Sequence, residues 1–273
     1  MPGPGPHAGD VATPVVSLRG VEKVFANGVR GLAPLDLEIR PGELVSLIGP
    51  SGCGKSTLLK LVANLHAPTD GQVAWWGGDF RTVGTDGRRL AFVFQDPTLM
   101  PWANVAANVR LPLDLDGVPR AAAERRVPPA LEQVGLAHAA ARFPAQLSGG
   151  MRMRVSIARA LVTNPDLLLM DEPFGALDEC TRNRLDEDMA GLCAQQGLTT
   201  LFVTHSLYEA AFLSSRVIVM AANPGRVFAE YVIEPGIARD GAFRLSARFA
   251  TICRDLTALL AEASASSRLD EES

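Results

Sequence analysis

Short apolar runs separated by polar or glycine-rich turns fill the first third of the chain. Their β-branched and large apolar residues predict strands over residues 15–18, 35–39, 44–48, 72–76 and 90–94. One leucine-rich stretch, residues 55–65, has helical spacing instead. We therefore expect this part of the chain to be mostly β-structure, interrupted by one helix.

The second half of the chain alternates between helical and strand-like patterns. Residues 103–160 are rich in Ala and Leu, and prolines at 112, 119, 128, 129 and 144 punctuate them. Strand-like runs return at 167–170, 199–203 and 217–220, with a helical segment at 181–195 between them. This alternation is typical of parallel α/β layers. The pattern of residues 239–269 predicts one or two amphipathic helices.

These patterns divide the chain into three predicted parts. Residues 1–13 are rich in Gly and Pro and are expected to be a flexible tail. Residues 14–236 are expected to form one α/β domain with a helical subdomain at about 100–160. Residues 237–273 are expected to be a helical tail.

Composition and charge exclude several classes of protein. The chain has 273 residues with 26 Lys and Arg against 30 Asp and Glu, and no long block of one charge indicates nucleic-acid binding. Its four cysteines lie far apart and predict free thiols in a reduced compartment. No window approaches 18 uninterrupted apolar residues, so a role at a membrane would require a partner protein.

Residues 49–57 match the pattern G-x-x-x-x-G-K-[ST] between an apolar strand and a helical run. In such a loop, successive backbone N–H groups at a helix N-terminus bind phosphate. We expect Lys55 to bridge the β- and γ-phosphates of a nucleotide and Ser56 to bind Mg²⁺. The alternative is a glycine-rich turn with an incidental lysine, but the flanking strand and helix favour nucleotide binding. The predicted phosphate-binding residues are Gly49, Pro50, Ser51, Gly52, Cys53, Gly54, Lys55, Ser56 and Thr57.

Two acidic residues follow the apolar run 167–170. Asp171 falls at the C-terminal end of this strand, where α/β sheets bind their ligands, and is expected to hold Mg²⁺ directly or through water. Glu172 is expected to point elsewhere and to polarise the water that attacks the γ-phosphate. The alternative is a solvated acidic cap after a buried strand.

Residues 147–151, Leu-Ser-Gly-Gly-Met, resemble the LSGGQ signature of ABC ATPases. Further motifs stand in the family order: Gln95 resembles the Q-loop, residues 175–178 the D-loop and His205 the H-loop. Phe25 stands where the family keeps an adenine-stacking aromatic residue. The resemblance covers about residues 15–236 and implies a P-loop NTPase fold: a RecA-like α/β core with an antiparallel β edge and an inserted helical subdomain.

The resemblance also implies the site and its ligands, ATP and Mg²⁺. In the family, two cassettes pair head to tail, and each ATP lies between the phosphate loop of one chain and the signature of the other. The implied catalytic residues are Lys55, Gln95, Glu172 and His205; the metal ligands are Ser56, Gln95 and Asp171; further nucleotide contacts are Phe25, Ser148, Gly149, Gly150 and Asp178.

Single residues of this set also have simpler interpretations. Gln95 could be any polar residue at a strand end, His205 a surface or core histidine, and Phe25 an ordinary core residue. Cys53, beside Lys55, could have a lowered thiol pKa, but a small residue that fills the loop is the preferred interpretation.

The expected function is that of the ATP-hydrolysing subunit of an ABC importer. It would form a homodimer at the cytoplasmic face of the inner membrane, docked on integral-membrane permease subunits and served by a substrate-binding protein. Met151 and residues 95–102 resemble the branch of nitrate, sulfonate and taurine importers, and apolar Trp102 among prolines predicts a permease-docking loop. The alternatives are an ABC ATPase acting on DNA or ribosomes, an exporter ATPase and a non-catalytic regulatory cassette.

Overall fold

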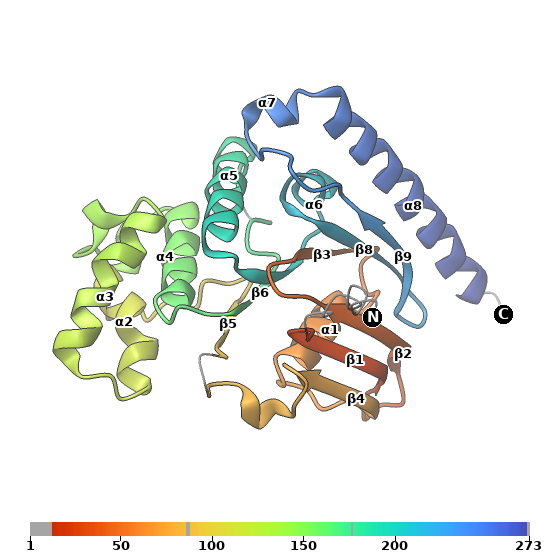
Figure 1. Cartoon of the computed structure of the whole chain (residues 1–273), viewed down its shortest axis with the longest axis horizontal. Coiled ribbons are helices and arrows are strands. Elements are labelled where there is room, and N and C mark those ends of the chain that lie inside the picture. Colours follow the sequence, from red (N-terminus) through yellow and green to blue (C-terminus); the bar gives the residue numbers. More distant parts are fainter. Residues whose placement is uncertain (1–12, 86–87, 176, 272–273) are drawn as a thin grey trace, which may run out of the picture.

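The computed structural model describes residues 13–85, 88–175 and 177–271, so the predicted flexible tail lies almost entirely outside the described residues. Two sheets meet in the centre of the fold (Figure 1). The larger contains, in spatial order, β5 (Leu90–Val93), β6 (Leu167–Asp171), β7 (Thr199–Val203), β3 (Leu44–Ile48), β8 (Arg216–Ala221) and β9 (Arg226–Val232). The smaller contains β2 (Arg30–Ile39), β1 (Val16–Val24) and β4 (Asp70–Trp75).

The larger sheet is parallel except for its last strand. Strands β5, β6, β7, β3 and β8 pair in parallel, whereas β9 runs antiparallel to β8. Every residue of β3 and β7 is buried, which is why both strands, apart from Ser46, are apolar or β-branched runs and not alternating patterns. Because the strands are parallel, their C-terminal ends lie along one edge, where the loops with the candidate site begin.

Helices cover both faces of this sheet and extend to one side of it (Figure 1). The group α2 (Val105–Leu115), α3 (Arg120–Gln133) and α4 (Gly149–Leu161) lies at one end of the molecule, and α4 packs against β5. Three of the prolines in this region, Pro112, Pro128 and Pro129, lie inside helices α2 and α3. The remaining helices are α1 (Lys55–Val62), α5 (Glu179–Gln196), α6 (Leu207–Leu213), α7 (Gly241–Arg244) and α8 (Ala247–Glu271), with 3₁₀ turns at Phe80–Thr82, Ala137–Ala139 and Pro144–Gln146.

The packed helix-and-sheet layers confirm the α/β P-loop fold with an antiparallel edge. Two strand predictions were too short, because β1 continues to Val24 and β2 begins at Arg30, and β9 was not predicted at all. The pairing of β1 with β2 shifts register between Leu18 and Val21, so the apolar alternation breaks there although the strand continues. No helix in the described part of the chain is long and apolar enough to cross a bilayer.

Candidate functional site

The loop between β3 and α1 curls around the ammonium group of Lys55. Lys55 Nζ donates hydrogen bonds of 2.9 Å to the Gly49 carbonyl and 3.0 Å to the Pro50 carbonyl, and its side chain is buried. Gly54 caps α1 with φ of 90°. The Cys53 thiol lies beneath the loop, and burial raises its pKa, so Cys53 packs in the core and is no reactive thiolate.

Ser56 and Asp171 lie together at the end of β6. The Ser56 hydroxyl donates a 2.9 Å hydrogen bond to Asp171 Oδ1, which joins the first turn of α1 to the C-terminal end of a parallel strand. The pairing places a hydroxyl and a carboxylate oxygen side by side. Such hard oxygen donors are what Mg²⁺ prefers.

Glu172 forms the centre of a second cluster. Its Oε1 lies 2.6 Å from His205 Nε2, and its Oε2 accepts a 3.3 Å hydrogen bond from Gln95 Nε2. The backbone of Glu172 has a φ of 47°, a left-handed conformation that is uncommon for a non-glycine residue and that clusters at functional sites. Two residues, Gln95 after β5 and His205 after β7, thus converge on the carboxylate of Glu172, which follows β6.

A cleft of about 360 Å³ connects these clusters to the smaller sheet. It is bordered by the phosphate loop with Lys55 and Ser56, by the Glu172 and His205 side chains, and by half-buried Phe25 just after β1. Sequence reasoning missed five residues that also border it, namely Val29, Arg30, Gly31, Asn223 and Gly225. They lie in or near the β1–β2 and β8–β9 turns, where the Asn27-Gly28 and Asn223-Pro224-Gly225 turn signals are the only clue.

The signature residues lie outside this cleft. Ser148 caps α4 by accepting a 3.3 Å hydrogen bond from Met151 N, and Gly149 and Gly150 form the first turn of that helix. Asp178 is exposed and caps α5 through Thr181 N at 3.0 Å, and hydrogen bonds from Thr181 lower its pKa. The fold therefore gathers the residues predicted from the phosphate loop, Asp171, Glu172, Gln95 and His205, but leaves the signature on a separate surface.

A family model described as ABC transporter matches residues 32–175, which include the phosphate loop, Gln95, the signature and Glu172. The chain belongs to the ABC transporter family. The resemblance of its motifs to those of ABC ATPases is thereby confirmed.

The chain is also similar to individual proteins and solved structures of this family. The chain is 46% identical to the bicarbonate transport ATP-binding protein CmpC of Synechococcus elongatus, over 77% of this chain but only 32% of that protein's length. It is 41% identical to the taurine import ATP-binding protein TauB of Rhizobium johnstonii, over 86% of this chain and 91% of that protein. The dimeric structure of MJ0796, a bacterial ABC transporter cassette, has a TM-score of 0.71 at 32% identity, covering 81% of this chain and 100% of that one. A post-hydrolysis state of the same cassette bound to ADP and Pi has a TM-score of 0.70.

Proposed function

We propose that this cassette binds ATP in the cleft beside Lys55 and hydrolyses it with Glu172 as the general base. The observation that carries the proposal is the placement of the Glu172 carboxylate between His205 and Gln95, at the border of the cleft that also contains Lys55 and Ser56. A carboxylate at that position can accept a proton from a water molecule that attacks the terminal phosphate. The half-buried Phe25 ring, which borders the same cleft, would stack on the adenine ring of ATP.

Each polar group of the cleft has one task in this mechanism. Lys55 and the loop N–H groups neutralise and orient the phosphates, and His205 holds Glu172 and stabilises charge that develops on the phosphate. The Ser56 and Asp171 oxygens fit Mg²⁺, which would neutralise phosphate charge when bound. Among the described residues no group of three or more His, Cys, Asp or Glu side chains could hold a metal, so phosphate and water oxygens must complete this site.

The signature surface supports a head-to-tail homodimer. Because Ser148, Gly149 and Gly150 begin α4 outside the cleft of their own chain, their N–H groups are free to meet the γ-phosphate bound by a second copy. The dimeric state of MJ0796 supports the same arrangement.

We further propose that the dimer energises import of a small solute at the cytoplasmic face of the membrane. The relatives named for taurine import and bicarbonate transport support this inference. Permease subunits would dock on the loop after Gln95, where Trp102 is 78% exposed, and a separate binding protein would deliver the solute. An exporter ATPase is the less favoured alternative because the relatives are importers by name.

The test is the substitution Glu172→Gln, which keeps the hydrogen-bonding shape of the side chain but removes its basicity. ATP hydrolysis should fall by about 100-fold or more while ATP binding stays intact, and the variant should accumulate as an ATP-bound dimer. Hydrolysis is measured by phosphate release and dimerisation by size-exclusion chromatography. Turnover near the wild-type rate would remove Glu172 from the catalytic role.

A further inference from the structure

A ring of polar contacts connects Glu172 and His205 behind the catalytic cluster. It passes from Glu172 to Phe174, then through Arg182 on α5 and Glu209 on α6, and returns through residues 204–206 to His205. The ring borders a cleft of about 320 Å³, which is separate from the cleft beside Lys55. Glu172 and His205 line both clefts. The two residues in the middle of the ring belong to no motif identified in the sequence.

Arg182 holds the backbone at Phe174 and at Leu177, which lie between Glu172 and Asp178 in the chain. Its guanidinium donates to the Phe174 carbonyl at 3.4 Å and to the Leu177 carbonyl at 2.7 Å. Two carbonyls three residues apart are thus fixed by one planar group, which only arginine supplies in this geometry. The left-handed backbone of Glu172 lies directly before this anchored segment and requires surrounding contacts to persist.

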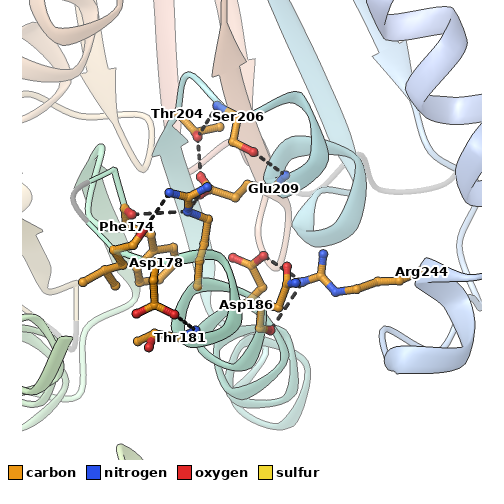
Figure 2. Close-up of polar contacts among 11 residues, drawn as sticks. Phe174, Asp178, Thr181, Asp186, Thr204, Ser206, Glu209 and Arg244 are labelled. Carbon is orange, nitrogen blue, oxygen red and sulfur yellow. Dashed lines mark hydrogen bonds and ion pairs between the residues drawn. The ribbon is translucent and has the colours of Figure 1, made fainter.

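Glu209 holds the other segment, residues 204–206. Figure 2 shows its carboxylate accepting a short hydrogen bond from the Thr204 hydroxyl, which in turn accepts from Ser206 N at 2.9 Å. The Ser206 hydroxyl also accepts from Glu209 N at 3.3 Å, as the N-cap of α6. His205 lies between these two residues and its side chain is 53% exposed, so its position depends on the backbone of this segment and not on packing around its ring.

An ion pair between Arg182 and Glu209 joins the two segments. Arg182 Nε lies 3.2 Å from Glu209 Oε1, and the Glu209 side chain is 4% exposed. Asp186, one turn further along α5, pairs with Arg244 of α7 at 2.7 Å, so two acids and two arginines share this buried region (Figure 2). Loss of one partner of such a pair leaves an uncompensated buried charge, which forces the attached segments to rearrange.

We propose that Arg182 and Glu209 are positioning residues for ATP hydrolysis: their ion pair sets the distance between His205 and Glu172 by holding both backbone segments at once. The inference rests on the proposed ATPase function. Neither residue lines the cleft beside Lys55, so the ring affects the reacting geometry and not the affinity for ATP. A displacement of about 1 Å in such a contact can cost up to about 100-fold in rate.

The test compares Glu209→Gln and Arg182→Lys with the wild-type full-length chain. Glu209→Gln keeps the shape but removes the charge, and Arg182→Lys keeps the charge but cannot hold two carbonyls. We expect kcat to fall about 10- to 100-fold in each variant, with KM for ATP within about twofold of wild type. The double variant should be no slower than the slower single variant, because both changes break one contact.

Arg216→Lys is the matched control. Arg216 has a comparably covered side chain, 14% exposed, that pairs with Glu43 at 2.9 Å and also reaches a backbone carbonyl, but it lies at the N-terminal end of β8, away from the site. Thermal unfolding verifies that every variant is folded, and the control should keep the wild-type kcat.

Three results would overturn the inference. These are an unchanged kcat in folded Glu209→Gln and Arg182→Lys, additive losses in the double variant, or an equal loss of kcat in Arg216→Lys. A wild-type chain without ATP hydrolysis would overturn the proposed function together with the inference, whereas an active wild type with unaffected variants would overturn the inference alone.

Discussion

Two glycines of the phosphate loop offer a matched test of how the loop is packed. Gly52 and Gly54 both have left-handed backbones, with φ of 80° and 90°, so an alanine at either position is strained by roughly 1–2 kcal/mol. Their surroundings differ. A Cβ on Gly54 would lie 2.5 Å from Leu32 Cδ2 and 2.9 Å from the Gly31 carbonyl, whereas a Cβ on Gly52 would have no neighbour within 4 Å.

The difference in free energy of unfolding follows from the contact with Leu32. That side chain is fully buried in the core beneath the loop, and the Gly31 carbonyl belongs to the backbone, so relief of both contacts must disturb the surrounding packing. Overpacking of this kind costs about 1–3 kcal/mol. Gly54→Ala should therefore lose about 1–3 kcal/mol more stability than Gly52→Ala.

The assay is urea unfolding of both variants and wild type without nucleotide, followed by titration with a fluorescent ATP analogue. Gly54→Ala should also lose more affinity, because the loop must lift away from Gly31 and Leu32. Equal losses of stability, or a larger loss in Gly52→Ala, would refute the packing of the loop described above.

Three further experiments test the docking loop, the buried acid Asp186 and the two-chain site. Trp102→Ala should change the free energy of unfolding by less than about 0.5 kcal/mol, because the side chain is exposed, while it reduces solute uptake in cells. A variant that fails to fold would mean that Trp102 belongs to the core. Burial raises the pKa of Asp186 from 3.8 to about 7, so the native state keeps a proton that the unfolded chain releases. The free energy of unfolding should therefore fall as pH rises from 3.8 to about 7. Asp186→Asn should reduce this pH dependence, as measured by urea unfolding at several pH values. Lys55→Ala and Ser148→Arg should each inactivate a dimer made of that variant alone. A mixed dimer of the two variants should trap nucleotide at its one intact site. A mixed dimer that traps no nucleotide would mean that both halves of each site belong to one chain.

The parts of the fold that the sequence predicts best are the ones buried on both faces. Strands β3 and β7 consist of apolar and β-branched residues apart from Ser46, and every residue in them is buried. Both strands were predicted with their observed bounds. Strand β9 has the residues Arg-Val-Phe-Ala-Glu-Tyr-Val and lies at an edge with most positions half-buried. Its Val, Phe and Tyr residues favour a strand, so the run carried a strand signal that the prediction overlooked.

The candidate site also has a part that the sequence predicts and a part that it does not. Lys55, Asp171 and Glu172 belong to contiguous motifs in which strand, loop and helix follow one another, so local spacing places them correctly relative to the sheet edge. Arg30 and Asn223 reach the cleft only because two turns of different sheets meet there. That proximity depends on tertiary packing, which spacing along the chain does not encode.

The central claim is that this chain hydrolyses ATP with the groups gathered around Lys55. The most direct measurement is phosphate release from ATP by the purified full-length chain with Mg²⁺, compared with Lys55→Ala. Since Lys55 Nζ is the cation at the phosphate loop, held by the Gly49 and Pro50 carbonyls, its removal should abolish phosphate release and weaken ATP binding. Wild-type chain that releases no phosphate from ATP, or Lys55→Ala that releases it at the wild-type rate, would contradict the account.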